Sequence, residues 1–220
     1  GEKIKKNLQK KFPSKLDIES SAWTALNCCS AGPKLKSELE DNLMVCPNCS
    51  THHYINPRER FDMHFGKNNW QEIKAPIPAD DPLQWSDSRP YKERLKEARK
   101  KTGQSCAVLS CKTQIDGIEI VTSAIDFRFI GGSIASAEGE NILQAVQTAI
   151  DNNCSYILFS ASGGMRMMES LISLTQMTRM TIAINELKKK RLPFINVFCN
   201  PTAGGTTASI SSLSDIAIAE

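Results

Sequence analysis

The sequence predicts an α/β domain preceded by a small cysteine-rich module. Strand-like and helix-like segments alternate after Gly103, as is typical of α/β folds. Two strand-like segments run directly into glycine pairs, "SASGG" and "NPTAGG", and four of the eight cysteines lie before residue 50. We therefore divide the chain into a basic lead-in (1–22), a degenerate C4-type zinc ribbon (23–55), a helical connector (56–103) and an α/β domain (104–220).

The composition is that of an ordinary globular protein. Hydrophobic residues make up 40% of the 220 positions, which is enough for a sizeable core, and the formal net charge is only +3. No apolar run approaches the roughly 20 residues that cross a bilayer. The lysine-rich start, "GEKIKKNLQKKFPSK", has no apolar segment typical of a signal peptide. We expect a cytoplasmic protein with reduced thiols and no membrane contact.

Only half of the cysteine module has the spacing of a zinc knuckle. "CPNC", which begins at Cys46 and ends at Cys49, can present two thiolates to one metal ion. Cys28 and Cys29 are adjacent instead, and Ala31 stands three residues after Cys28.

Four thiolates converge only if the backbone bends so that both Cys28 and Cys29 face the metal. Otherwise one knuckle is broken, and His52 or His53 is the alternative fourth ligand, unless these histidines are simply surface residues. We predict a structural zinc site with the ligands Cys28, Cys29, Cys46 and Cys49.

The later elements follow from turn residues and apolar periodicity. The proline-broken connector predicts two short helices, and Asp116-Gly117 predicts a tight hairpin between two strands. Helices are expected over "AEGENILQAVQTAIDNN" and from about residue 168 to residue 190, and strands over "SYILFS", "LPFINVF" and "SDIAIAE". The residues expected to face the core are Ile142, Val146, Ala149 and Ile150 in the first helix and Leu171, Leu174, Met177, Met180, Ile184 and Leu187 in the second.

The two glycine pairs carry the clearest chemical signal. Without a Cβ, the backbone N–H groups of Gly163, Gly164, Gly204 and Gly205 can point outward and hold an oxyanion, such as the enolate oxygen of a thioester. The structural alternative is that both pairs are tight turns or close helix–sheet contacts.

Two enzyme classes are disfavoured by the same loops. No lysine followed by serine or threonine comes after the glycines, so the loops lack a phosphate-binding motif. "SASGG" lacks the glycine of a nucleophile elbow, and no histidine follows His64, so a serine hydrolase triad has no base.

Several motifs together resemble a known family. These are "NLMVCPNC", "DSRPYKERL", "DFRFIGGSIAS", "FSASGGMRMMESLISLTQM", "RLPFINVF" and "PTAGGTTAS", and the likeness runs from Ala22 to Glu220. In them the chain resembles the carboxyltransferase subunit beta of the bacterial and plastid acetyl-CoA carboxylase.

The resemblance implies a fold, a reaction and partners. The fold is a crotonase-like (ClpP/crotonase) spiral ββα domain with an N-terminal zinc ribbon. The reaction transfers a carboxyl group from carboxybiotin, borne by the biotin carboxyl carrier protein, to acetyl-CoA, and it forms malonyl-CoA for fatty acid biosynthesis. Biotin itself serves as the base, which agrees with the missing catalytic histidine. The expected partners are a subunit alpha, in an alpha2beta2 heterotetramer, and biotin carboxylase.

The resemblance also implies roles for single residues. Gly204 and Gly205 would hold the thioester oxygen, and the loop of Gly163 and Gly164 would be the other donor source. Gly131 and Gly132 would lie near bound CoA, although a structural role is slightly favoured for this pair. Arg166 would either meet a CoA phosphate or tie the start of a helix to a neighbour.

Three departures from the family pattern stand out. Ala135 replaces a usual glycine, and Met165 replaces a usual alanine, so that it would narrow the acyl pocket or move the loop. Family members continue beyond the position of Glu220, and we therefore expect a fragment or a truncated product.

Two other functions stay open. One is a related biotin-dependent decarboxylase or a crotonase-fold acyl-CoA enzyme; a hydratase would need an acidic side chain at the loops, for which Glu169 is the candidate. The other is a zinc-ribbon protein that binds nucleic acid through the lysine-rich lead-in, with salt-dependent affinity.

Overall fold

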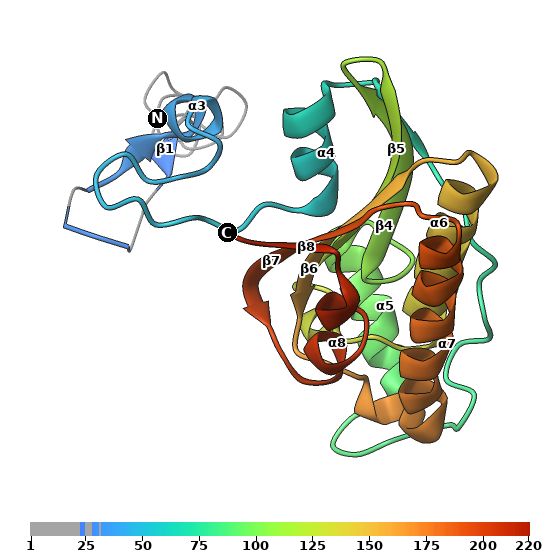
Figure 1. The fold of residues 1–220 in the computed structure, drawn as a ribbon. Coiled ribbons are helices and arrows are strands. Elements are labelled where there is room, and N and C mark those ends of the chain that lie inside the picture. The colour runs from blue at the N-terminus through green and yellow to red at the C-terminus, as the bar shows by residue number, and fades with distance from the viewer. Residues whose placement is uncertain (1–22, 25–27, 31) are drawn as a thin grey trace, which may run out of the picture. The chain divides into compact units, whose positions relative to one another are not determined.

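The computed structural model describes residues 23–24, 28–30 and 32–220. The predicted basic lead-in and Ala31 lie outside these described residues. The chain divides into two compact units, residues 1–55 and 56–220 (Figure 1). Each unit is described by itself below.

The small unit contains short elements around the cysteines. Strand β1 (Trp23–Thr24) pairs antiparallel with β2 (Lys34–Leu35), and helix α3 (Lys36–Asp41) follows. A single β-bridge joins Val45 to His52. Leu39 and Cys46 are buried at the centre, and Met44 packs against them.

The large unit is a six-stranded mixed sheet in the order β3-β4-β5-β6-β7-β8. The first two pairings are antiparallel, and β5, β6, β7 and β8 run parallel to one another. The strands are β3 (Trp70–Glu72), β4 (Val108–Ile115), β5 (Ile118–Ile125), β6 (Ser155–Ser162), β7 (Phe194–Thr202) and β8 (Ile216–Ala219).

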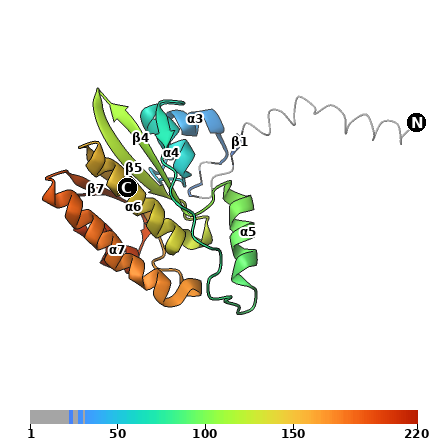
Figure 2. The same ribbon diagram turned by 90° about the vertical axis from the view of Figure 1, so that its right-hand side faces the viewer.

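Helices cover both faces of this sheet. α6 (Ser136–Asp151) and α7 (Ser170–Lys189) lie side by side on one face, where α5 (Tyr91–Thr102) also contributes to the core (Figures 1 and 2). α4 (Pro57–Phe65) packs on the other face through Phe61. The remaining helix, α8 (Gly204–Ala208), follows β7. Three 3₁₀ turns span Ile130–Gly132, Met167–Glu169 and Ser211–Leu213.

Local sequence explains where several elements begin and end. Asp116 and Gly117 both have positive φ, +50° and +79°, which is the geometry of the predicted two-residue hairpin between β4 and β5. Asn56 and Glu59 form a reciprocal capping box at the start of α4. Gly103 ends α5 with a left-handed φ of +70°.

The predicted connector is wrong as a separate segment. β3 joins the edge of the sheet by pairing with β4, and Tyr91, Leu95 and Ala98 of α5 are part of the main core. The structure has no domain boundary at residue 103. The sequence suggested one because residues 56–103 are mostly polar, and their contacts with β4 and the main core are long-range.

The predicted core face of α6 is confirmed, whereas that of α7 is confirmed only in its second half. Met180, Ile184 and Leu187 are buried, but Leu171 and Leu174 are 68% and 52% exposed. In the first turns of α7 the buried positions belong to Ser173 and Gln176. Gln176 takes this place because its side chain fills the space left by the missing Cβ of Gly139 in α6.

Within the described residues, we find no helix that combines the length and the apolar character needed to cross a membrane.

One prediction concerns the turn that follows β5. Gly132 has a φ of +60°, and a Cβ there would overlap the carbonyl oxygen of Ala161 in β6 and lie 3.2 Å from Ile125 Cγ2. Because a backbone atom cannot move aside, we expect Gly132→Ala to lower the free energy of unfolding by about 3 kcal/mol or more in urea titrations.

The neighbouring glycine provides a matched control. Gly131 has a similar φ of +65° but no atom within 4 Å of its ideal Cβ position. Gly131→Ala should therefore cost only the backbone strain of about 1–2 kcal/mol. Equal losses in the two variants would contradict the overlap at Gly132.

Candidate functional site

Three glycine loops meet at one edge of the sheet. They follow the carboxyl ends of the parallel strands β5, β6 and β7 and contain Gly131 and Gly132, Gly163 and Gly164, and Gly204 and Gly205, respectively. In α/β sheets, ligands bind outside the carboxyl ends of parallel strands. The three loops therefore lie where a ligand site is expected.

The second and third glycine loops touch through their backbones. A Cβ on Gly204 would lie 3.0 Å from the carbonyl oxygen of Gly163, and one on Gly164 would lie 3.1 Å from the nitrogen of Gly205. Gly164 and Gly204 also have positive φ values of +116° and +60°. Both positions thus require glycine for space and for conformation.

The donor role predicted for Gly163 and Gly164 is corrected by the structure. The amide of Gly163 donates to the carbonyl oxygen of Gly131 at 2.9 Å, and the amide of Gly164 donates to the hydroxyl of Ser162 at 3.1 Å. The first bond joins two loops, and the second lies at the end of β6, so both N–H groups already have acceptors. Gly163 and Gly164 therefore have the structural role that the sequence left as the alternative. Gly131 shares this role, because its carbonyl oxygen accepts from Gly163.

Gly204 and Gly205 differ from the other glycine pairs. They form the first turn of α8, where backbone N–H groups have no partner inside the helix, and neither amide donates to an acceptor within the described residues. Gly204 is exposed and Gly205 is half-buried. Two consecutive amides in this position can hold an oxyanion.

Met165 lies directly against this turn. The place of a Cβ on Gly205 is filled by the side chain of Met165, with its Sδ 2.9 Å away, and the Sδ of Met177 is 3.3 Å away. Met165 therefore covers one side of Gly205. The other departure, Ala135, causes no strain, because its φ of −129° and ψ of −165° are extended values open to any residue.

The predicted contact between Arg166 and a CoA phosphate is also corrected. The side chain of Arg166 is only 1% exposed, and its guanidinium pairs with Glu138 at 2.7 Å. It also donates to the Tyr91 hydroxyl at 2.9 Å and to Ser133 Oγ at 3.0 Å. Arg166 thus ties the segment before α7 to α5 and α6.

Glu169 belongs to the same buried network. Its carboxylate accepts from the Tyr91 hydroxyl at 2.8 Å and from the amide of Ser136 at 2.9 Å. Burial raises the pKa of the Tyr91 hydroxyl, which keeps it protonated as this donor. Glu169 is only 3% exposed, so it does not offer the free acid that a hydratase would need.

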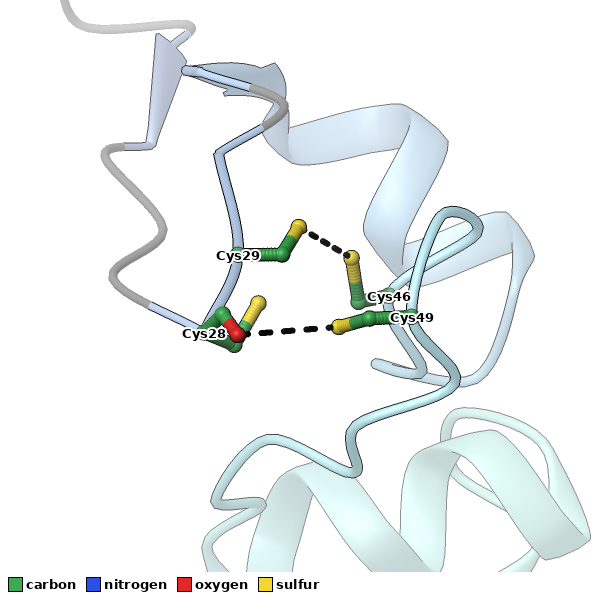
Figure 3. A group of neighbouring side chains, drawn as sticks. All are labelled: Cys28, Cys29, Cys46 and Cys49. Carbon is green, nitrogen blue, oxygen red and sulfur yellow. Dashed lines mark hydrogen bonds between the residues drawn. The ribbon is translucent and has the colours of Figure 1, made fainter.

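In the small unit, the four predicted metal ligands converge. The Sγ atoms of Cys28, Cys29, Cys46 and Cys49 all lie within 4.8 Å of one another (Figure 3). The Cys29 and Cys46 sulfurs are 3.9 Å apart, close to the edge of about 3.8 Å in a tetrahedron with Zn–S bonds of about 2.3 Å. This thiol cluster therefore fits a tetrahedral zinc ion, although the two adjacent cysteines break the usual spacing.

The thiols of this cluster differ in acidity. Hydrogen bonds from the hydroxyl and main chain of Thr51 lower the pKa of Cys49 to about 6. Burial and hydrogen bonds among the thiols raise the pKa of Cys28 to about 12. At neutral pH a metal ion thus meets the Cys49 thiolate and must displace the proton of Cys28.

Of the two candidate histidines, only His53 approaches the thiol cluster. Nε2 of His53 lies 3.6 Å from Sγ of Cys28, whereas His52 is exposed. The spacing of the cysteines gave no signal for His53, because its approach depends on the pairing of the chain after Cys49 with the chain before Cys46.

The other four cysteines are buried and behave as core residues, as the sequence predicted. Burial raises the pKa of each of these thiols, which keeps them protonated and unreactive at neutral pH. They are Cys106, Cys111, Cys154 and Cys199.

Comparisons with known proteins agree on one family. Residues 80–220 match the model of the carboxyl transferase domain. The whole chain is 56% identical over 220 residues to the acetyl-coenzyme A carboxylase carboxyl transferase subunit beta of Pelagibacter ubique and spans 70% of that protein. It is 42% identical over 208 residues to the protein of the same name from Dinoroseobacter shibae, covering 94% of this chain and 64% of that one.

Solved structures show a related fold at low sequence identity. A Pseudomonas malonate decarboxylase hetero-dimer matches 75% of this chain and 61% of its own with a TM-score of 0.55 and 20% identity. Transcarboxylase 12S, with methylmalonyl-coenzyme A and methylmalonic acid bound, matches 74% of this chain and 29% of its own with a TM-score of 0.56 and 20% identity. At this identity the likeness concerns the fold alone.

The buried ion pair gives a test of the role of Arg166. We expect Arg166→Met to lower the free energy of unfolding by about 3–5 kcal/mol, because Glu138 would stay buried without its partner. Arg89→Met, which breaks an exposed pair with Glu97, should lower the free energy of unfolding far less, because solvent screens that pair. Urea titrations measure both values. An Arg166→Met protein of unchanged stability would contradict the structural role and reopen the phosphate contact.

Proposed function

The chain belongs to the carboxyl transferase family, in its acetyl-CoA carboxylase subunit beta branch, and on this premise we propose that it transfers a carboxyl group from carboxybiotin to acetyl-CoA and so forms malonyl-CoA. The observation that carries the proposal is the 56% identity to a subunit beta over all 220 residues. The chain is accordingly a transferase that acts in fatty acid biosynthesis.

The geometry of the loop that contains Gly204 and Gly205 supports this reaction. The amides of Gly204 and Gly205, at the start of α8, would hold the thioester oxygen as it gains charge. Carboxybiotin, when bound, supplies the carboxyl group and the base, so the chain needs no catalytic histidine or free carboxylate. The side chain of Met165 beside Gly205 would limit the space next to the acyl group.

The assembly we propose is that of the family. The chain would work with a subunit alpha, in an alpha2beta2 heterotetramer, and would receive carboxybiotin from the biotin carboxyl carrier protein after biotin carboxylase has loaded it. None of the eight cysteines forms a disulfide, which suits a reducing cytoplasmic compartment. The crotonase-like spiral fold belongs to the same proposal and is supported by the likeness to decarboxylase and transcarboxylase chains.

We also propose that the small unit is a zinc ribbon. Its support is the convergence of the four sulfur atoms of the thiol cluster. A structural zinc ion can contribute on the order of 10 kcal/mol to a unit with little core of its own. Among the described residues of this unit, the buried cluster consists of Leu39 and Cys46. Residues 34–53 would therefore depend on the metal for their order.

The reaction can be tested in reverse. The full chain is mixed with a subunit alpha, and malonyl-CoA-dependent carboxylation of free biotin is measured. We expect turnover with both subunits and none with either alone. A stable complex that produces no carboxybiotin would contradict the transferase, and decarboxylation of malonyl-CoA without biotin would favour the related decarboxylase.

The same assay tests the role of the loop that contains Gly204 and Gly205. Gly205→Ala places a Cβ against Met165, and the resulting shift of the donors should lower kcat about 100-fold. Met165→Ala is the matched control, because it removes the obstructing side chain. The double variant Met165→Ala, Gly205→Ala should recover much of the lost kcat; a double variant as slow as Gly205→Ala would contradict this geometry.

The metal site is tested separately from activity. We expect one zinc ion per chain by elemental analysis, and Cys28→Ala should lose it, whereas Cys154→Ala, at a buried thiol outside the cluster, should keep it. Affinity should fall as the pH drops through about 6, where the Cys49 thiolate is protonated. Equal zinc content in both variants would contradict the assignment.

A further inference from the structure

The segment after Cys49 folds back along the segment before Cys46. The amide of Cys46 donates to the carbonyl oxygen of Thr51 at 2.9 Å, and the amide of His53 donates to that of Met44 at 2.9 Å. Val45 and His52 form the β-bridge between these two bonds. Residues 51–53 are thus held in fixed register beside the second pair of cysteines.

This register determines to which side the side chains of residues 51–53 point. Alternate residues of an extended segment point to opposite sides, so Thr51 and His53 share one side and His52 takes the other. Oγ1 of Thr51 lies 3.1 Å from Sγ of Cys49, and Nε2 of His53 lies 3.6 Å from Sγ of Cys28. The sulfur atoms that they approach come from the two different halves of the thiol cluster.

Both side chains can donate a hydrogen bond to sulfur. In the thiol form, Cys49 donates to the Thr51 hydroxyl, but a hydroxyl group is both donor and acceptor, so its proton can turn toward a thiolate. The Nε2 atom of a neutral imidazole donates in one of its two tautomers. Threonine and histidine are therefore suited to the ionised cluster.

The ionised cluster needs such donors. Four thiolates around one divalent cation carry a net charge of −2, and a partly buried site must offset that charge with hydrogen bonds. We propose that Thr51 and His53 are positioning residues of the zinc site, which hydrogen-bond to the Cys49 and Cys28 thiolates without binding the metal. This inference rests on the proposed zinc site.

Coordination by His53 is the competing arrangement. Four sulfurs already complete the tetrahedron of a structural zinc site, so an imidazole could bind only by replacing one of them. The 3.6 Å separation from Cys28 is a hydrogen-bond distance to sulfur, and it places His53 beside a ligand. The His53 imidazole thus hydrogen-bonds to the Cys28 thiolate, and Cys28 remains the metal ligand.

The test measures metal release from the full chain. Zinc-loaded protein is mixed with an excess of a chromophoric chelator, and the release rate is followed. His53→Ala and Thr51→Val should each release zinc about ten-fold faster than the unchanged protein, as expected for lost partners of ligand atoms. His53→Gln and Thr51→Ser keep a donor and should restore slow release.

His52→Ala is the matched control, because the neighbouring imidazole is exposed. It should release zinc at the unchanged rate. If His53→Ala and His52→Ala release zinc at the same rate while the unchanged protein binds one ion, the inference fails and the zinc site stands. If the unchanged protein binds no zinc, the site and the inference fail together.

Cobalt substitution separates the two roles of His53. The sulfur-to-cobalt charge-transfer band of the Co²⁺-loaded protein should have the intensity of four thiolates, and His53→Ala should keep that intensity. A band that corresponds to three thiolates in the unchanged protein would identify His53 as a ligand and overturn the proposal.

Discussion

The fold around the candidate site depends on one buried guanidinium. Arg166 joins Glu138 of α6, Tyr91 of α5 and Ser133 in the loop after β5. The pairing is tolerated in the interior because the carboxylate is also saturated, by the amides of Ala107 and Ala135. Arg166 lies in the segment after β6, and Glu138 lies in the first turn of α6. The ion pair therefore holds the segment after β6 against the start of α6. The glycine loops can approach one another closely because both of these points are held.

The close approach of the loops explains why one pair of amides is left for chemistry. The amide of Gly163 binds its loop to that of Gly131, and the amide of Gly164 donates to Ser162 at the end of β6. The loop after β7 lies in close backbone contact with the loop of Gly163 and Gly164. The amides of Gly204 and Gly205, in the first turn of α8, have no acceptor among the residues that the structure describes. An oxyanion site of this kind depends on the packing behind it, since the donors themselves belong to the main chain.

Local patterns in the sequence predicted most elements but not the partners of charged and polar groups. The hairpin at Asp116, the strands and the core face of α6 follow from short-range rules. The roles of Arg166 and Gly163 do not, because their partners are 28 to 75 residues away for Arg166 and 32 positions earlier for Gly163. The same limit explains the error in α7, where Gln176 is buried only because α6 offers Gly139 opposite it.

The thiol cluster has a consequence for how such proteins are recognised. Two adjacent cysteines, Cys28 and Cys29, both reach the shared centre, although the usual interval between them is absent. The four sulfur atoms meet in three dimensions, although the number of residues between the ligands departs from the usual spacing. A sequence search that requires the fixed interval would miss this chain, whereas a structural search for converging sulfur atoms would find it.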